Sequence, residues 1–406
     1  MSVSRRKFLL QTGALGCCLA ANPLVTPVAL AQTAGEKRLV VIILRGGMDG
    51  LDVLRPLGDP LLASYRAQIG SAAIDDSIAL NGFFGMHRGL SKLAPLWTAG
   101  DLSFAHAVST PYRDKRSHFD GQDVLEAGAG PDHDGRIREG WLNRLLQTLP
   151  NATSETAFAI GREDMLVMSG SAPVSSWAPD GRLDLSPQGR LLLEHLYHDD
   201  PLFRDASIDA IEIAESLGVA SENSFGQNAA DRQLQVKQSA RADKADVLAQ
   251  FAAQRLKDDA RIAAFSVSGW DTHRGQTGGI TRALGNLQNA ILTLKDELGP
   301  VWDQTAIVAM TEFGRTVQEN GTRGTDHGTG GAMVMAGGAV NGGHVWGDWP
   351  GLEEAQLYER RDLMPTSDVR AYAAWLMTGM FGVGQTALET VVFPGLQLGR
   401  DPGVLA

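Results

Sequence analysis

Residues Thr305–Gly343 read TAIVAMTEFGRTVQENGTRGTDHGTGGAMVMAGGAVNGG, and this stretch decides the fold that we expect. Its first part, Ala306–Met310, is a short apolar run without alternation, which predicts a buried strand of a parallel sheet. A second apolar run, Ala332–Ala336, follows a segment rich in glycine. Because open α/β sheets bind ligands at the carboxyl ends of their strands, we expect a functional site where the first run ends.

Polar residues begin at the point where that first strand should end. Glu312 and Arg315 follow it directly, and Asp326 and His327 come shortly before the second apolar run. The glycines between them allow the backbone to double back tightly. An acid after one strand and an Asp-His pair before the next can therefore converge on one point, as metal binding or hydrolysis requires.

Two other apolar runs are followed by residues that can bind metals. Leu39–Leu44 precedes Asp49, which has a glycine near it on each side, and Arg261–Val267 precedes Asp271 and His273. A solvated turn is the alternative for Asp49, and a chance pairing is the alternative for the other two. Three strand ends in succession with such residues favour one metal site at a common sheet edge.

The residues after a further predicted strand, Leu102–Val108, suggest a nucleophile or an anion site. Ser117 or Asp114 could cap a helix that begins near His118. Ser117 could equally be a nucleophile, and we place it with His118 among the candidate catalytic residues. A helix start beside basic residues also attracts anions. These basic residues are Arg113, Lys115 and Arg116.

The remaining chain alternates between predicted helices and loop-rich segments. Helical patterns cover Gly189–Leu256, which we interpret as a cap or an insert. The other predicted helices are Leu90–Ala99, Thr281–Leu298 and Asp368–Met380, with Asp368 as the N-cap of the last. Short strands are predicted at Ala157–Ile160 and Met165–Met168 within a region rich in Gly, Pro, Ser and Asp.

The first 31 residues have the pattern of a twin-arginine signal peptide. Ser4–Leu10 reads SRRKFLL, a mildly apolar segment follows, and Ala29–Ala31 reads ALA, a small-x-small cleavage site. We expect cleavage after Ala31 and export by the twin-arginine machinery, to the periplasm or out of the cell. Both cysteines, Cys17 and Cys18, lie in this segment, so the mature chain should contain no disulfide.

Composition and charge exclude several classes of function. The chain has 406 residues, of which 43% are hydrophobic and 20% are charged, as in soluble globular proteins. Without the three basic residues of the signal, 33 basic residues stand against 47 acidic ones, a net charge of −14. Such a surface repels nucleic acid and anionic lipid. After the signal, no apolar run approaches the length that would span a bilayer, so we expect no stable membrane insertion.

Five motifs, in order along the mature chain, resemble a family of exported bacterial proteins called domain of unknown function 1501. They are RGGMDGLD, RSHFDGQDVLEAG, GWDTHRGQ, TEFGRT and GTDHG. The family is similar to the alkaline phosphatase-like superfamily of phosphatases and sulfatases. The resemblance implies one α/β domain over residues 37–406, with a doubly wound, mostly parallel sheet, helices on both faces and a helical insert at 189–256.

The resemblance also implies divalent metals, often a zinc pair, at the carboxyl edge of the sheet. By position, Asp49 looks like the metal-binding Asp after the first strand, Asp271 and His273 like a second ligand group, and His327 like a late ligand. Glu312 or Asp326 would complete the set. The expected function is hydrolysis of small anionic phosphate or sulfate esters, with Arg315 or Arg116 as an additional clamp.

Two departures from the superfamily pattern leave an alternative open. Glu312-Phe313 stands where active members carry Asp-His, and Ser117, Thr110 and Asp114 compete for the role of nucleophile. The alternative is an exported binding or assembly protein whose catalytic activity has lapsed. A redox protein is disfavoured, because the chain has no cysteine set, haem motif or dinucleotide-binding glycine turn.

Overall fold

A computed structural model describes the chain from residue 36 onward with five internal gaps. The described residues are 36–69, 76–113, 116–130, 138–161, 165–179 and 244–406. The predicted signal peptide and most of the predicted helical insert lie outside them. From Lys244 onward, the last part of the predicted insert forms a helix, α11 (Lys244–Lys257), which packs against the main sheet as one of its covering helices.

A nine-stranded sheet forms the centre of the described molecule, in the order β11-β5-β10-β9-β1-β8-β6-β7 with β12 beside β5. Its strands are β1 (Arg38–Arg45), β5 (Leu102–Ser109), β6 (Ala157–Ile160), β7 (Ser175–Trp177), β8 (Ile262–Ser268), β9 (Thr305–Thr311), β10 (Gly331–Ala336), β11 (Val345–Trp346) and β12 (Ser367–Asp368). The strands predicted from unbroken apolar runs are therefore confirmed, each to within a residue or two.

The sheet is mostly parallel, and β10 is its antiparallel strand. β1 pairs in parallel with β8 and β9, whereas β10 runs antiparallel to both β9 and β5. The first residue of β10, Gly331, consequently lies at the same edge as the end of β9. Residues 312–330 connect the two strands along this carboxyl edge, where the exits of β1 and β8 also lie. The sheet topology thus brings three strand exits and the start of β10 together.

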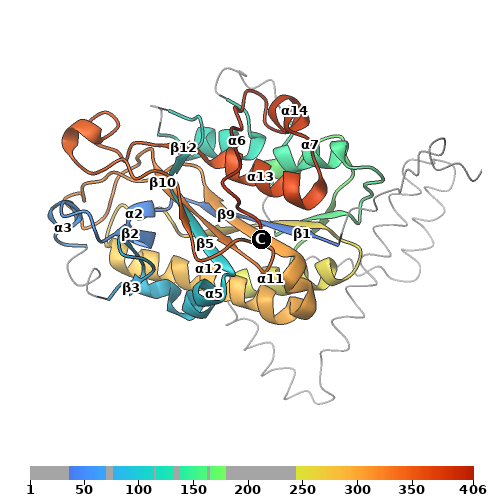
Figure 1. The fold of residues 1–406 in the computed structure, drawn as a ribbon, viewed down its shortest axis with the longest axis horizontal. Helices are drawn as coiled ribbons and strands as arrows, with labels where there is room; N and C mark the ends of the chain where they lie inside the picture. Colours follow the sequence, from blue (N-terminus) through green and yellow to red (C-terminus); the bar gives the residue numbers. More distant parts are fainter. Residues whose placement is uncertain (1–35, 70–75, 114–115, 131–137, 162–164, 180–243) are drawn as a thin grey trace, which may run out of the picture.

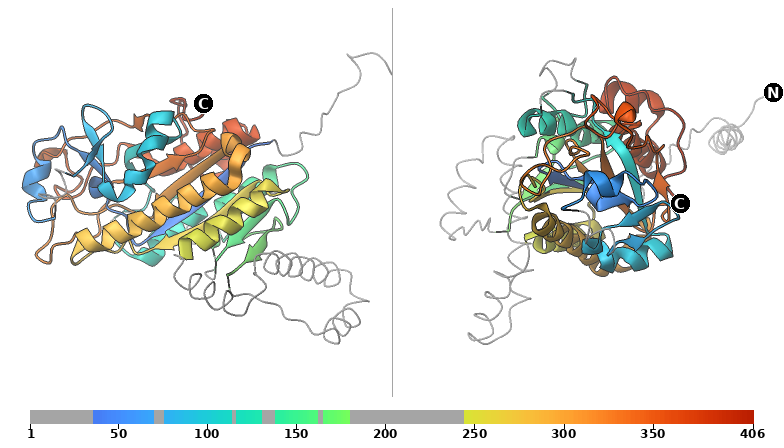
Figure 2. Two further views of the ribbon diagram at one scale, coloured as in Figure 1. Left: turned by 90° about the horizontal axis from the view of Figure 1, so that it is seen from below. Right: turned by 90° about the vertical axis from the view of Figure 1, so that its left-hand side faces the viewer.

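Helices cover both faces of the sheet, as the sequence predicts for an α/β fold (Figures 1 and 2). One face packs against α5 (Ala94–Ala99), α11 and α12 (Gln276–Leu298), with the 3₁₀ helix η1 (Arg88–Leu93). The other packs against α6 (His118–Ala127), α7 (Trp141–Thr148) and α13 (Val369–Phe381). In β1, Val40, Ile42 and Leu44 face the first core, and the alternate residues face the second. This explains the unbroken apolar run, since both faces are buried.

Shorter elements complete the described fold. A small antiparallel sheet, in the order β2-β4-β3, lies beside the exit of β1. It consists of β2 (Leu54–Pro56), β3 (Ile78–Ala79) and β4 (Phe84–Met86). The remaining short helices are α2 (Gly50–Val53), α3 (Leu62–Tyr65), η3 (Leu166–Met168), η4 (Gly299–Gln304), η5 (Glu354–Gln356), α14 (Gln385–Ala387) and the π-helix η6 (Leu388–Val392). None of the described helices is long and apolar enough to cross a membrane.

One predicted strand is wrong. Met165–Met168 was expected to be extended, but Leu166–Met168 forms a 3₁₀ helix instead. Both edges of the preceding strand β6 are paired, one with β7 and the other with β8, so this segment cannot pair with β6. The main-chain N–H of Val167 instead donates to the buried carboxylate of Glu126, 3.0 Å away.

Candidate metal centre

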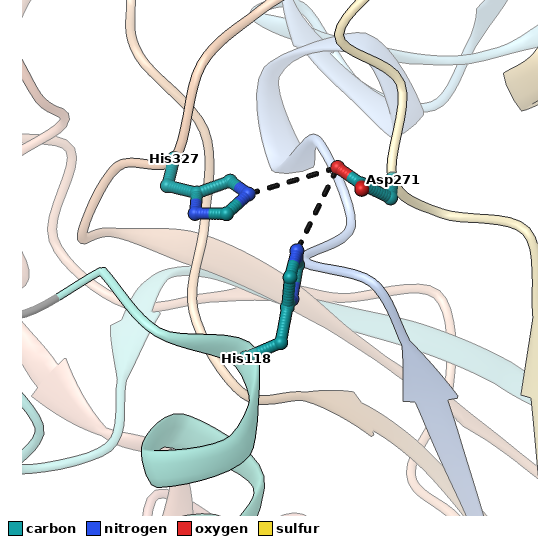
Figure 3. A group of neighbouring side chains, drawn as sticks. All are labelled: His118, Asp271 and His327. Atoms are coloured by element: carbon teal, nitrogen blue, oxygen red, sulfur yellow. Dashed lines mark ion pairs between the residues drawn. The ribbon is translucent and has the colours of Figure 1, made fainter.

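Two imidazoles and a carboxylate from distant parts of the chain meet at the carboxyl edge of the sheet. His118 begins α6, Asp271 follows β8, and His327 precedes β10. Figure 3 shows both histidines directed at the carboxylate, with each Nε2 atom 3.6 Å from Asp271 Oδ1. The candidate ligand atoms of the three residues all lie within 4.8 Å of one another. One metal ion could contact all three.

A third imidazole, that of His273, extends this group. Its Nε2 lies 3.1 Å from Asp271 Oδ1 and 2.9 Å from the Nε2 of His327. We call His118, Asp271, His273 and His327 the His/Asp cluster. Within the described part of the chain, the buried Nε2 of His118 has no hydrogen-bond partner. An orphaned nitrogen that faces a carboxylate, beside a second imidazole, is the arrangement expected of a metal ligand.

The three imidazoles share a hydrogen-bonding pattern that fixes their tautomers. In each ring, Nδ1 contacts an oxygen that lies outside the cluster. The contacts are His118 to Glu312 Oε1 at 2.8 Å, His273 to Asp326 Oδ1 at 3.1 Å, and His327 to the Arg116 carbonyl oxygen at 2.8 Å. Because a carbonyl or a carboxylate can only accept, Nδ1 carries a proton in each ring, and a neutral ring then directs its Nε2 lone pair into the cluster. Two such lone pairs, on His273 and His327, are 2.9 Å apart, so this contact requires a proton on one of the two nitrogens or a metal ion between them. Histidines that bind metals are usually held in this way.

The buried groups of the site influence one another's pKa values. Burial alone would raise the pKa of Glu312, but hydrogen bonds from His118, Thr311 and Gln122 outweigh it and hold that pKa below its usual value. The same hydrogen bond to Glu312 raises the pKa of His118, against the opposing effect of burial. Burial lowers the pKa of His327, so this ring stays neutral and ready to bind a metal.

Asp271 is the acidic member of the cluster and the most exposed one, with 51% of its side chain accessible. Burial raises its pKa, but the hydrogen bond and charge of Arg315, with Nη2 2.7 Å from Oδ1, hold that pKa below its usual value. Asp271 is therefore a carboxylate at neutral pH. Since it and His273 are partly open to solvent, an ion held here would be within reach of water and small molecules.

Arg315 is 1% exposed and lies beneath the cluster. Besides Asp271, its guanidinium donates to the carbonyl oxygens of Gly46, Gly47, Trp270 and Thr325. These carbonyls belong to the exits of β1 and β8 and to the segment before β10. The geometry gives Arg315 a positioning role inside the protein; its action on a substrate stays a prediction.

The structure does not bring Asp49 into the His/Asp cluster. Asp49 is 1% exposed, and its two carboxylate oxygens accept from Arg66 at 2.5 and 3.2 Å. One of them also accepts from Gln276 Nε2 at 2.6 Å. Glu312 and Asp326, predicted as ligands, lie instead behind the imidazoles of His118 and His273 and hold their Nδ1 atoms.

The structure assigns Ser117 a capping position. It is the N-cap of α6, where its hydroxyl accepts from the main-chain N–H of Asp120 at 3.4 Å, and its own N–H donates to Tyr112 Oη. Thr110 is buried and donates to the Glu312 carbonyl. The competing candidate Asp114 lies outside the described residues.

Phe313 forms the wall of the site at the position where the resemblance leads one to expect a histidine. Its ring lies against those of His118 and His327, with centroids 5.1 and 4.9 Å apart. A Cβ at Gly47 would lie 2.7 Å from this ring, and Gly47 has a φ of +67°, so a glycine is required there. His118 thus reaches the cluster from α6, beside a ring that cannot bind a metal.

Sequence reasoning missed the two buried residues that hold Asp49, and it classed His118 as catalytic rather than as a candidate ligand. Gln276 could have been noticed as the last residue of the motif GWDTHRGQ. Arg66 lies between Asp49 and the predicted helix Leu90–Ala99, where no sequence pattern marks it.

Comparison with known proteins gives a family but no activity. The model of a family described as "Protein of unknown function (DUF1501)" matches residues 81–373. No curated protein matches this chain. Among solved structures, the chain is similar to one titled "Crystal structure of Ps i-CgsB in complex with k-i-k-neocarrahexaose", with a TM-score of 0.37 and 11% identity. That alignment covers 86% of this chain and 74% of the other.

Proposed function

The chain belongs to the DUF1501 family of proteins of unknown function, and from that premise we propose that it is a metal-dependent hydrolase of small anionic esters. The His/Asp cluster would hold one divalent ion. The observation that carries this proposal is the common orientation of three imidazoles, each with Nδ1 on an external oxygen and Nε2 directed into the cluster.

The donor set supports a first-row divalent metal such as zinc. Two imidazole nitrogens and one carboxylate oxygen, from His118, His327 and Asp271, are ligands that zinc prefers, and His273 lies beside them as a further donor. The exposed sides of Asp271 and His273 leave room for water or substrate at such an ion. A divalent ion bound there would activate water and neutralise charge on a phosphoryl or sulfuryl group.

The surroundings of the cluster support an anionic substrate. The N-terminus of α6 lies beside His118, and helix N-termini attract negative charge. Arg116, whose carbonyl holds His327, has a side chain that is 43% exposed and pairs with Glu359 only at 3.4 Å. Phosphate and sulfate esters therefore remain the substrate class that we propose.

We extend the proposal to the ancestry and location of the protein. The mostly parallel sheet with the His/Asp cluster at its carboxyl edge is consistent with the alkaline phosphatase-like superfamily. The twin-arginine pattern in residues 1–31 supports export to the periplasm or beyond. Folding before export would allow the metal to be acquired inside the cell.

The test compares His327→Ala with His344→Ala. His344 is an exposed histidine outside the cluster, so its replacement is a matched control. We expect the wild type and His344→Ala to hydrolyse aryl phosphate or aryl sulfate esters after metal loading. His327→Ala should lose both the metal and the turnover while keeping its circular dichroism spectrum. Unchanged metal content and turnover in His327→Ala would remove this residue from the site.

A second candidate function is metal-dependent binding without catalysis. It is favoured by the absence of an obvious protein nucleophile among the described residues at the cluster, since Ser117 caps α6 and Asp49 is held by Arg66. In that case the metal would be present, but neither ester class would be hydrolysed. The same assay separates the two candidates, because metal content and turnover are measured on one sample.

A further inference from the structure

Gln276, at the start of α12, connects the two segments that carry most of the His/Asp cluster. It is completely buried. Its Oε1 accepts from the hydroxyl of Thr272, 3.0 Å away, and from the hydroxyl of Thr325, 2.7 Å away. Thr272 stands between Asp271 and His273 in the sequence, and Thr325 stands two residues before His327.

The amide nitrogen of Gln276 faces two buried carboxylates on the opposite side. Nε2 donates to Asp49 Oδ2 at 2.6 Å and to Asp52 Oδ2 at 3.0 Å. Each of these carboxylates also pairs with an arginine, Arg66 and Arg55 respectively. Both amide hydrogens and both amide lone pairs of Gln276 are therefore used, and a glutamine is the side chain that offers two donors and two acceptors in this geometry.

The main chain around Gln276 strengthens the same connection. Its own N–H donates to the carbonyl of Arg323 at 2.8 Å, and the N–H of Thr325 donates to the carbonyl of Thr272 at 3.2 Å. The loop after β8 and the segment before β10 are thus joined directly, while the side chain of Gln276 ties both to the buried carboxylates at the exit of β1.

We propose that Gln276 is a positioning residue for the metal centre, which sets the distance between the Asp271/His273 pair and His327. This inference rests on the proposed function, because it concerns the same site. Buried polar networks hold their members rigidly only when every member is satisfied. Removal of the amide would leave two hydroxyls and two carboxylates without this partner and would allow the two ligand-bearing segments to shift.

The experiment measures cobalt(II) binding by full-length variants, with the visible spectrum as a report on ligand geometry. Gln276→Met keeps the size of the side chain and removes the amide. Gln288→Met is its control, because Gln288 is also buried on α12 but accepts from the main-chain N–H of Lys92, away from the cluster. We expect Gln276→Met to weaken cobalt binding by about 10- to 100-fold and to alter the spectrum, whereas Gln288→Met should change neither.

A milder pair of variants keeps the test decisive if Gln276→Met does not fold. Thr325→Val removes one of the two hydroxyls that donate a hydrogen bond to Gln276 Oε1. Its control, Thr305→Val, removes a buried hydroxyl that donates to the Val301 carbonyl, far from the cluster. Thr325→Val should weaken cobalt binding and Thr305→Val should not. If folded Gln276→Met keeps the cobalt affinity and the spectrum of the wild type, the role of Gln276 is overturned. If Gln276→Met does not fold, the same result in Thr325→Val overturns it. No cobalt binding by the wild type would overturn the metal centre itself, and with it this role.

Discussion

Asp49 and Asp271 follow neighbouring parallel strands, β1 and β8, yet they have opposite surroundings. Asp49 is 1% exposed and makes a two-oxygen ion pair with Arg66. The side chain of Asp271 is 51% exposed, and its Oδ1 faces Arg315 and three imidazoles. A carboxylate at a strand end is therefore not a metal ligand by position alone. The groups that the fold brings to it decide between an internal ion pair and a candidate metal centre.

The strongest way to break this comparison is to remove the partner of Asp49. Arg66→Met would leave a carboxylate buried without its counter-charge, which costs about 3–5 kcal/mol of the free energy of unfolding. Urea denaturation measures this loss. The control is Arg88→Met, because Arg88 pairs with Asp76 on the surface, where such pairs contribute about 0–1 kcal/mol. Equal effects of the two substitutions would contradict the buried ion pair.

Acid should lower the free energy of unfolding through His87, which lies near Asp49 and Asp52. Burial lowers the pKa of this histidine to about 4, with Asp52 and Asp49 partly opposing the effect. The unfolded chain takes up the proton near pH 6.5 and the folded chain only near pH 4, so stability is complete above about pH 6.5 and falls as the pH drops toward 4. The loss is about 3 kcal/mol at the end of that range.

The substitution His87→Asn isolates this contribution. His87 Nδ1 accepts from the N–H of Gly89 as the cap of η1, and an asparagine can still accept there without titrating. We expect a shallower decline of stability between pH 6.5 and 4 in urea unfolding experiments. Part of the decline should remain, because His106 is buried and has a pKa of about 4 as well. An unaltered slope would show that His87 does not carry the effect.

On the Asp271 side, Glu312 tests whether the tautomer of His118 matters. Glu312→Gln preserves the shape but can present an N–H to Nδ1, which would move the imidazole proton to Nε2. We expect the dissociation constant for zinc to rise by about 10- to 100-fold, measured by competition with a chromophoric chelator. Asp326→Asn should have a smaller effect, since Asp326 is 57% exposed and its bond to His273 competes with water. A larger loss of zinc affinity in Asp326→Asn than in Glu312→Gln would contradict the role of Glu312 in fixing the tautomer of His118.

The smallest effect concerns Ser117, at the border between the cluster and α6. Ser117→Gly should cost a few tenths of a kcal/mol, because glycine is tolerated at N-caps. If Ser117 only caps the helix, ester turnover should stay close to that of the wild type. A loss of turnover by several orders of magnitude, with metal content preserved, would instead make Ser117 the nucleophile.

The sequence predicts the strands well, because unbroken apolar runs such as Leu39–Leu44 reflect burial on both faces of a sheet. The family was also identified correctly from its motifs. The direction of β10 could not be predicted, since an apolar run of six residues carries no information on whether it pairs in parallel or antiparallel.

The site was predicted as a set of residues rather than as an arrangement. Asp271, His273 and His327 do lie together, but Glu312 and Asp326 stand behind imidazoles instead of inside the His/Asp cluster. The width of one imidazole ring separates these two roles, and residue spacing in the sequence cannot resolve it. The pairing of Asp49 with Arg66 depends on a long connection whose path the sequence does not reveal.

The most direct measurement is the metal content of the folded protein by mass spectrometry, beside the double variant Asp271→Ala/His273→Ala. Both should be purified without chelator and offered zinc, calcium and manganese. We predict close to one equivalent of divalent metal in the wild type and almost none in the double variant, with the fold preserved in both. No metal in the wild type, or equal metal in the two proteins, would contradict the metal centre at the carboxyl edge of the sheet.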